Sequence, residues 1–562
     1  MKDYEFFFTS SLEKVFPVKR PTIVSTNTRS AFQGEKIAFQ FVYYKKEKVE
    51  YVPQDEFLIE IRGELKDFFR LRKVELIPSD FPAYGKQDEG YLTTAPGMFP
   101  DLLVPMKPGE TIRPITNQYR SIWIDLTIPM EQNSGTYNME LSISLRKKSE
   151  NTDEAVTIPF SVKVIDSPLP KQELVHTEWF HCDGLAAYYE EEVFSERHWE
   201  IVSNFIAMAG KELRINALLT PVFTPPIDTA VGHERKTVQL VDINVHDGIY
   251  SFDFSKLERW CKICKENQIS YIEIPHFFSQ WGAFATPKIM ATVNGKYQQI
   301  FGWDVKSDDC RYRHFLECYI PALRKELVAL GYDEKHTIYH ISDEPSLNHL
   351  ATYKKARELV LDLLEGATIM DALSDVAYYK EGLVTNPIPS VDSFHNFEEL
   401  NIDNLWTYYC CGQCVDVPNR FFAQPSYRNR ILGVLMYVHR VKGFLHWGYN
   451  FYNTAGSLKH INPYIVTHAN YTFPSGDAFL VYPAEDGKAY SSIRGEVLYD
   501  AFVDQAALKQ LEALTSRDHV LALIKTGRKE AFTFFDYPKE AQYLIDLRQR
   551  VYDEIEKVRI LN

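Results

Sequence analysis

The sequence is poor in the features that mark membrane-spanning, secreted and disulfide-rich proteins. Its 562 residues contain no run of 18 apolar residues, so no membrane-spanning segment is expected. The first residues, MKDYEFFFTSSLEKVF, lack the basic region, apolar run and small-residue cleavage site of a secretory signal. Only eight cysteines are present, which favours reduced thiols over a disulfide framework. Together these absences predict a cytoplasmic protein that does not associate with membranes.

The chain also lacks an excess of basic residues. It has 62 Lys and Arg against 76 Asp and Glu, which gives a formal net charge of −14. Because phosphate backbones are bound by clustered Lys and Arg, nucleic acid is not expected as a partner. The hydrophobic share of 45% and the charged share of 25% are typical of a globular protein.

Residues 1–168 are predicted to form an all-β sandwich. Five segments alternate apolar and polar side chains with the two-residue period of a half-buried strand: 37–44, 57–65, 121–129, 137–145 and 157–165. No helical stripe of comparable strength interrupts them, so a sandwich is the simplest arrangement. Residues 166–170, Asp-Ser-Pro-Leu-Pro, are predicted to be a linker because prolines donate no ladder hydrogen bonds.

From residue 169 to 515, short apolar strands alternate with amphipathic helices such as 199–213 and 315–330. Eight strands are predicted: 174–180, 215–221, 269–277, 336–342, 367–372, 388–394, 404–410 and 443–449. Eight strand–helix units in roughly 330 residues indicate a TIM-like (β/α)8 barrel of the α/β class. A doubly wound sheet is the alternative, but no strand is followed by a Gly-rich phosphate-binding turn. Residues 516–562 are predicted to form a charged helical extension packed on the barrel.

Two adjacent carboxyl groups, Asp343 and Glu344, follow the fourth predicted barrel strand. In such barrels the active site lies at the carboxyl ends of the strands. Strict alternation would send the two side chains to opposite faces, but Pro345 disfavours helical backbone at Glu344. Both carboxyl groups reach the barrel mouth if the backbone turns between them. Two carboxyl groups in unlike environments are what glycosidic cleavage requires, one as an acid and one ionised.

Aromatic and polar residues lie at the other strand ends. The aromatic residues are Trp179, Trp281, Trp406, Tyr408 and Trp447, and the polar ones are His276, Asp371, Asp392 and Asn450. Indole rings pack against the apolar faces of sugar rings and leave the hydroxyls to polar neighbours. This set predicts a pocket for a neutral, hydroxyl-rich ligand. Burial in the core is the alternative for the tryptophans and for His276, and Tyr409 competes with Tyr408.

The second half of the chain resembles the catalytic domain of glycoside hydrolase family 123, the β-N-acetylgalactosaminidases. The matching stretches are HISDEPS (340–346), WTYYCCG (406–412), NRILG (429–433), GFLHWGYNFY (443–452), GDAFLVYP (476–483) and SIRGEVL (492–498). The combination of DEP at the fourth strand end with GFLHWGYN at the eighth is the specific part. The sequence departs from the family pattern at Tyr499 and Gln505, where a basic and an acidic residue are expected.

The resemblance implies retaining, substrate-assisted removal of terminal β-linked N-acetylgalactosamine. The acetamido oxygen of the substrate would attack the anomeric carbon and form an oxazoline-like intermediate. Glu344 would act as acid and then base, and Asp343 would orient the acetamide N–H. Tyr408 would donate a hydrogen bond to the acetamide oxygen. Further sugar contacts are expected from Trp406, Trp447, Asn450, His276 and Trp281.

Several alternatives stay open. The same mechanism could act on another β-N-acetylhexosamine or within a chain, and the barrel could instead be a non-catalytic sugar-binding protein. The sandwich itself could bind carbohydrate. No cofactor and no metal is expected, because Cys261-x-x-Cys264 and Cys410-Cys411-x-x-Cys414 lack partners nearby in the sequence. The expected partner is an oligosaccharide or glycoconjugate substrate, and the size of the chain is compatible with a homodimer.

Overall fold

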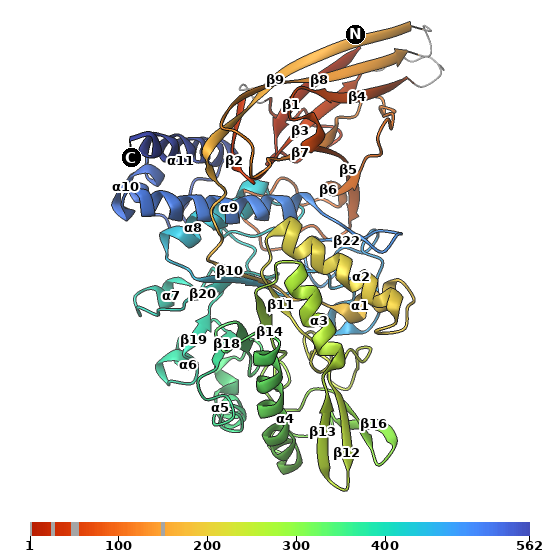
Figure 1. Ribbon diagram of the computed structural model, residues 1–562, viewed down its shortest axis with the longest axis vertical. Helices are drawn as coiled ribbons and strands as arrows, with labels where there is room; N and C mark the ends of the chain where they lie inside the picture. The colour runs from red at the N-terminus through yellow and green to blue at the C-terminus, as the bar shows by residue number, and fades with distance from the viewer. Residues whose placement is uncertain (1–2, 24–27, 47–54, 148–151, 562) are drawn as a thin grey trace.

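The computed structural model describes residues 3–23, 28–46, 55–147 and 152–561. Its N-terminal part is a sandwich of two sheets, drawn at the top of Figure 1. One sheet has the order β1 (Tyr4–Ser10), β3 (Lys36–Lys45), β7 (Arg120–Thr127), β5 (Phe69–Ser79) and β6 (Gly97–Pro105). The other has the order β2 (Thr28–Gln33), β9 (Thr152–Pro168), β8 (Gly135–Lys147) and β4 (Glu56–Arg62). All five predicted segments are strands, and buried side chains of both sheets form one core.

The second part is an eight-stranded parallel sheet curved into a nearly closed barrel. Its strands are β10 (Val175–Glu178), β11 (Ala217–Leu219), β14 (Tyr271–Glu273), β17 (Thr337–Tyr339), β18 (Thr368–Ala372), β19 (Asn386–Ile388), β20 (Trp406–Tyr408) and β21 (Gly443–His446). Seven of the eight fall within their predicted segments, whereas β19 begins two residues before the predicted 388–394 and overlaps it only at Ile388. The prediction of an eight-stranded parallel barrel is confirmed. The edge strands β19 and β20 meet at a parallel bridge between Ser390 and Tyr408.

Helices cover the barrel and extend to the C-terminus. They are α1 (Cys182–Tyr188), α2 (Glu196–Ala207), α3 (Ser255–Glu266), α4 (Cys310–Ala329), α5 (Leu350–Glu358), α6 (Ala377–Lys380), α7 (His395–Glu398), α8 (Ser426–Val438), α9 (Ile493–Leu514), α10 (Arg517–Ile524) and α11 (Ala541–Leu561). The two helices predicted at 199–213 and 315–330 are confirmed as α2, with its π-helical continuation to Glu212, and α4. None of the helices in the described part of the chain is long and apolar enough to cross a membrane.

A small sheet inserted into the barrel loops was missed by the strand prediction. It has the order β13 (Ile249–Asp253), β12 (Asp242–His246), β15 (Ile289–Val293) and β16 (Lys296–Phe301). Its two hairpins turn at Asp247-Gly248 and Asn294-Gly295, and all four residues have positive φ. Asp-Gly and Asn-Gly are strong two-residue hairpin signals, so the sequence did contain the information.

Helix α9 lies between the sandwich and the barrel (Figure 1). Its buried Glu496 pairs with Lys36 and Arg72 of the sandwich, each at 2.8 Å. These two cations outweigh the effect of burial and lower the pKa of Glu496. Helix α11 also contacts both parts, because Arg548 pairs with Asp500 of α9 at 2.9 Å and Tyr552 donates to Glu35 of the sandwich at 2.8 Å. The predicted extension therefore packs on the sandwich as well as on a barrel helix.

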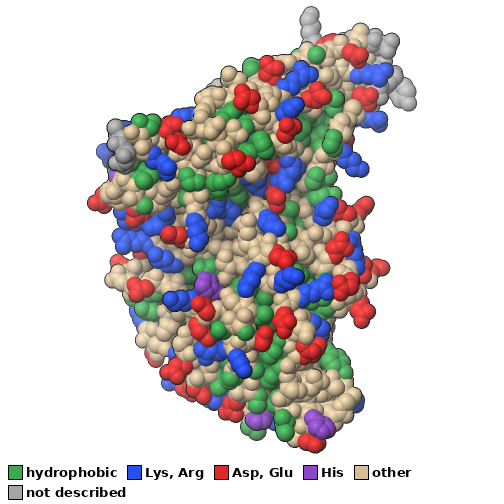
Figure 2. All heavy atoms as spheres, in the orientation of Figure 1, with side chains coloured by type: hydrophobic (Ala, Val, Ile, Leu, Met, Phe, Trp, Pro, Cys, Tyr) green, Lys and Arg blue, Asp and Glu red, His purple; other side chains and the backbone are tan. Residues whose placement is uncertain are grey.

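The face of the molecule seen in Figure 2 carries acidic and basic side chains interspersed with one another. Hydrophobic side chains lie among them in scattered groups. This mixture is typical of a solvated protein surface.

Candidate active site

A deep pocket opens at the carboxyl ends of the barrel strands. It contains about 1130 Å³ of space not filled by protein atoms, part of which is open to solvent. Its polar wall includes Asp228, Gln280, Asp343, Glu344 and Tyr408, and its apolar wall includes Trp179, Trp281, Leu445, Trp447 and Phe473. A pocket of this size and composition can hold one sugar residue and part of a second group.

The two adjacent carboxyl groups both line this pocket. The backbone turns between them because Glu344 has a left-handed φ of 42°. Such a conformation is costly for a residue other than glycine, and hydrogen bonds to the end of β18 and to the loop after β14 hold it in place. The amide of Glu344 donates to the carbonyl of Ala372 at 3.1 Å, and the amide of Trp281 donates to the carbonyl of Asp343 at 3.0 Å. The turn that the sequence required is therefore present.

Each carboxyl group has its own hydrogen-bond donor. The Tyr408 hydroxyl donates to Glu344 Oε1 at 2.6 Å, and Gln280 Nε2 donates to Asp343 Oδ2 at 2.9 Å. The Gln280 amide is oriented by the backbone N–H of Asp228, which donates to Gln280 Oε1 at 2.5 Å. Gln280 and Asp228 were missed from the sequence because both lie in loops beyond the strand ends, without a motif of their own.

Burial and mutual repulsion decide how the carboxyl pair ionises. Burial raises the pKa of Asp343, and the neighbouring charge of Glu344 raises it further, while the Gln280 hydrogen bond acts in the opposite direction. Burial also raises the pKa of Glu344, and the hydrogen bond from Tyr408 offsets part of this rise. A raised pKa is the property that a general acid needs in order to keep its proton near neutral pH.

A buried histidine pair lies beneath the pocket. His340 Nε2 contacts Glu273 Oε1 at 2.7 Å, and His340 Nδ1 lies 3.7 Å from Asp371 Oδ1. Burial alone would lower the pKa of His340, but Asp371 and Glu273 outweigh it and raise the value to about 10. This environment favours the imidazolium form of His340. Glu273 Oε1 also accepts a hydrogen bond from the pocket residue Trp179 at 2.7 Å, so this ion pair positions a pocket wall.

His276, His340 and Asp371 form a cluster whose ligand atoms lie within 4.8 Å of one another. However, the two imidazole rings are stacked, with centroids 4.6 Å apart and planes 29° apart. A metal ion lies in the plane of each imidazole that binds it, about 2 Å from the nitrogen, and nearly parallel rings share no such point. The stacked geometry does not fit joint coordination. His276 is a neutral ring whose pKa is lowered by burial and by the charge of His340.

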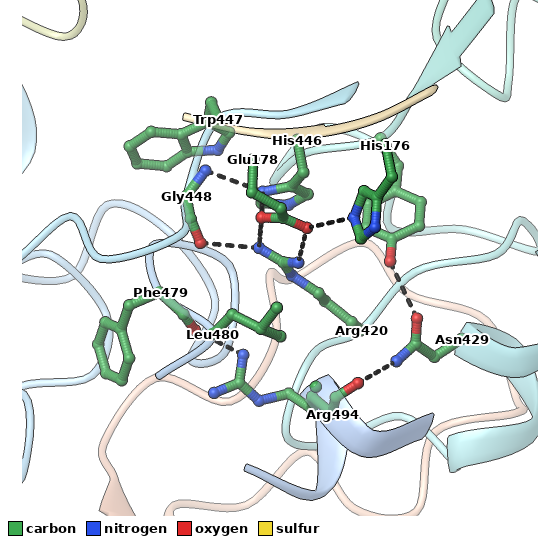
Figure 3. A network of polar contacts seen from close by, with 12 residues as sticks. His176, Glu178, Arg420, Asn429, His446, Trp447, Gly448, Phe479, Leu480 and Arg494 are labelled. Atoms are coloured by element: carbon green, nitrogen blue, oxygen red, sulfur yellow. Dashed lines mark hydrogen bonds and ion pairs between the residues drawn. The ribbon is translucent and has the colours of Figure 1, made fainter. Parts of the chain in front are cut away.

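A second buried network supports Trp447 (Figure 3). Arg420, from the loop after β20, forms a bidentate ion pair with Glu178 of β10, with N–O distances of 2.7 and 3.2 Å. Its Nη2 also donates to His446 Nδ1 at 2.7 Å and to the carbonyl of Gly448 at 2.8 Å. The residues on both sides of Trp447 are thus held by one guanidinium group.

The indole of Trp447 is fixed from its other side by Asp477. Its Nε1 donates to Asp477 Oδ2 at 3.1 Å. Burial raises the pKa of Asp477 to about 7. Trp447 therefore presents a defined face to the pocket.

The predicted site residues fall into two groups. Asp343, Glu344, Tyr408, Trp281 and Trp447 line the pocket together. Trp281 is also half exposed at the mouth, with 50% of its surface accessible. Of the two competing tyrosines, Tyr408 reaches the pocket, whereas Tyr409 is buried and donates to Asn429 at 3.0 Å.

The other three predicted sugar contacts lie outside the pocket lining. Trp406 shares the barrel interior with Tyr408 but lies one layer deeper, packed against Gly443. Asn450 is buried, and its side chain accepts from the backbone N–H of His181 at 2.8 Å, joining the loops after β10 and β21. His276 is buried against His340. Two-residue alternation predicts which face a side chain takes but not its depth in the barrel.

The cysteine groups occupy different environments. Cys261 and Cys264 are buried in α3, and Cys410 and Cys411 line the pocket. All eight cysteines are free thiols. A hydrogen bond with Cys411, together with burial, raises the pKa of Cys410 well above its ordinary value, so its thiol stays protonated.

A parallel barrel with paired carboxyl groups at the carboxyl ends of its strands, walled by aromatic rings, has the architecture of a glycoside hydrolase. The sequence profile of the glycoside hydrolase 123 catalytic domain matches residues 179–511, more than half of the chain. The chain therefore belongs to glycoside hydrolase family 123, as the sequence motifs predicted.

Comparison with solved structures supports the same fold. A family 123 glycoside hydrolase from Clostridium perfringens, whose structure was analysed for glycolipid glycan hydrolysis, is similar with a TM-score of 0.73 and 14% identity. The match covers 99% of this chain and 98% of that one. A β-glucuronidase from Parabacteroides merdae is far less similar, with a TM-score of 0.28, 8% identity, and coverage of 90% of this chain and 51% of that one. No curated protein matches the chain.

Proposed function

We propose that this glycoside hydrolase removes terminal β-linked N-acetylgalactosamine by a retaining, substrate-assisted mechanism. The observation that carries the proposal is the carboxyl pair at one pocket wall, where Glu344 and Asp343 have separate donors, Tyr408 and Gln280. When the substrate supplies its own nucleophile, the enzyme needs one carboxyl group as acid and base and a second to orient the acetamide. Two adjacent carboxyl groups with separate donors fit this requirement.

In the first step the acetamide oxygen forms a bond to the anomeric carbon while the glycosidic C–O bond breaks. Glu344 gives its proton to the leaving oxygen, and its raised pKa supports that role. With the proton on Glu344, the charge that raises the pKa of Asp343 is absent, and Asp343 is ionised with Gln280 as its hydrogen-bond donor. It then accepts the acetamide N–H and stabilises the positive charge that develops on the oxazoline. In the second step water attacks the anomeric carbon, Glu344 takes its proton, and the acetamide is restored.

The Tyr408 hydroxyl has two successive hydrogen-bond acceptors in this scheme. In the empty pocket its hydroxyl donates to Glu344, at 2.6 Å. We propose that it turns to the acetamide oxygen when substrate binds, which frees Glu344 to protonate the leaving group. Trp281 and Trp447 would pack on sugar faces, because both are pocket residues with flat apolar surfaces. We assign Trp406, Asn450 and His276 supporting positions behind the wall.

A third carboxyl group, that of Asp228, makes an enzymic nucleophile the main chemical rival. Asp228 lines the same pocket, and burial raises its pKa to about 6. The test is release of p-nitrophenol from the β-N-acetylgalactosaminide, the β-N-acetylglucosaminide and the plain β-galactoside, with Glu344→Gln and Asp228→Asn variants. Turnover of acetamido sugars alone, lost in Glu344→Gln by about 10²–10⁴-fold, is expected. Turnover of the plain galactoside, lost in Asp228→Asn, would reject the substrate-assisted mechanism.

The same assay separates the remaining alternatives. The ratio of the two acetamido sugars identifies the preferred hexosamine, and turnover only of longer glycans would indicate internal cleavage. Sugar binding without any turnover, unchanged in Glu344→Gln, would identify a binding protein. Cytoplasmic location, a homodimer, and the domain limits 1–168, 169–515 and 516–562 remain predictions for cell fractionation, light scattering and limited proteolysis.

A further inference from the structure

A strained turn stands at the rim of the pocket. Three consecutive non-glycine residues, Ala469, Asn470 and Tyr471, have left-handed φ values of 46°, 64° and 62°. Left-handed backbone costs about 1–2 kcal/mol per residue, so a run of three needs a compensating reason. The next two residues, Thr472 and Phe473, line the pocket, while Tyr471 is 59% exposed. The turn therefore exposes the aromatic residue that immediately precedes two pocket residues in the chain.

The β5–β6 loop of the sandwich braces this turn. The Phe81 ring lies against Tyr471, with centroids 6.3 Å apart, and against His468 at 6.4 Å. The Tyr84 hydroxyl donates to the carbonyl of Thr472 at 2.8 Å. Within the turn, the amide of Tyr471 donates to His468 Nδ1 at 2.8 Å. The rim of the barrel pocket is thus built partly by the N-terminal domain.

The bracing loop, residues 80–96, is itself anchored on the barrel. Asp88 forms an ion pair with the buried Arg428 at 2.9 Å. The Tyr91 hydroxyl donates to the carbonyl of Cys414 at 2.8 Å. With these anchors the loop can hold the exposed ring in one place, which reduces the entropy that a ligand loses on binding there.

We propose that Tyr471, held by the β5–β6 loop, forms a subsite for the sugar on the leaving-group side of the scissile bond. This inference rests on the proposed function, because a terminal sugar in the pocket leaves the rest of the glycan at the rim. An exposed tyrosine ring that packs against Phe81 offers an apolar face to a sugar, and the next two residues in the chain, Thr472 and Phe473, line the pocket. The sandwich then contributes to substrate recognition by bracing the rim.

The test compares two substrates that share the terminal sugar. One is the methyl β-N-acetylgalactosaminide, whose leaving group is too small to reach the rim, and the other is a trisaccharide with terminal β-linked N-acetylgalactosamine. Released N-acetylgalactosamine is measured for both. The Tyr471→Asn variant removes the ring while keeping a residue that tolerates left-handed backbone. The Tyr471→Phe variant keeps the ring. Tyr297→Ala is the matched control, because Tyr297 is 61% exposed on β16 and does not line the pocket.

We expect Tyr471→Asn to lower kcat/KM for the trisaccharide about tenfold, mainly through KM, and to change kcat/KM for the methyl glycoside less than about twofold. Tyr471→Phe and Tyr297→Ala should resemble the wild type on both. An equal loss on both substrates, or no loss on either, would overturn the subsite.

Binding is measured in the Glu344→Gln variant, with and without Tyr471→Asn. The measured quantity is the dissociation constant of the trisaccharide divided by that of N-acetylgalactosamine. Tyr471→Asn should raise this ratio about tenfold, and an unchanged ratio would overturn the proposal. Absence of turnover in the wild type would refute the proposed function. The ratio of dissociation constants would still show whether Tyr471 contributes to binding of the longer glycan.

Discussion

The buried ion pair between Arg420 and Glu178 gives a quantitative test of how the pocket is supported. Arg420 is 1% exposed and makes four hydrogen bonds, two of them to Glu178 and one to the carbonyl of Gly448 beside Trp447 (Figure 3). Removing one partner leaves the other as a buried unpaired charge, which costs about 3–5 kcal/mol. We therefore expect Arg420→Met to lower the free energy of unfolding of the barrel by about 4 kcal/mol.

The double-mutant cycle isolates the pair. Glu178→Gln alone strands the guanidinium and should cost about 3 kcal/mol, but Arg420→Met combined with Glu178→Gln leaves no buried charge. The double variant should therefore recover at least about 2 kcal/mol relative to the sum of the single variants. Urea unfolding followed by tryptophan fluorescence is a suitable assay, because all tryptophans except Trp123 lie in the barrel part of the sequence.

Two results would refute this reasoning. A cost below about 1 kcal/mol for Arg420→Met would mean that the guanidinium is solvated or that the barrel adapts to its loss. Strictly additive single and double variants would mean that the two groups do not interact. The ring of Trp447 supplies a second readout, since loss of the bond to Gly448 should change its environment before global unfolding.

Three further predictions concern the site and one helix contact. Tyr408→Phe removes the hydrogen bond that lowers the pKa of Glu344, so the pKa rises and the basic limb of the pH–kcat/KM profile moves to higher pH. Gln280→Leu removes the donor that favours ionised Asp343, so the pKa of Asp343 rises and the acid limb moves to higher pH. Gly433→Ala would place a methyl group 1.9 Å from a backbone oxygen of α9 and should lower the midpoint of urea unfolding by the equivalent of at least about 1–3 kcal/mol.

Each of these predictions has its own contradicting outcome. If Tyr408→Phe moved the acid limb, or Gln280→Leu the basic limb, the acid and orienting roles of the carboxyl pair would be exchanged. The acid and basic limbs of the pH profile report pKa values of the coupled Asp343–Glu344 pair, not of either residue alone. Both variants are therefore compared with the wild type across the full pH range. An unchanged unfolding midpoint in Gly433→Ala would mean that α8 and α9 separate easily. Gly97→Ala is its control, because a Cβ at Gly97 meets nothing within 4 Å.

Local patterns in the sequence determined the order and place of the barrel strands. The two-residue alternation of a strand and the turn residues at its ends depend only on neighbouring positions. They can therefore be recognised in the sequence before the fold is known. The same locality explains why Asp343 and Glu344 could be predicted to share one pocket, since they adjoin each other at a strand end and precede a proline. The inserted sheet also had a local signal in the sequence, its Asp-Gly and Asn-Gly turns. Its strands were missed because they carry many exposed polar residues and show no clear apolar alternation.

Contacts between distant segments were decided only by the tertiary structure. Glu178 and Arg420 are 242 positions apart, and each reads in the sequence as an ordinary charged residue. Gln280 reaches Asp343 because the loop after β14 folds over the end of β17. Tyr471 packs against Phe81 of the N-terminal sandwich, although 390 positions separate the two residues in the sequence. Such neighbours are set by how the elements pack, and the energy that selects that packing is spread over the whole core.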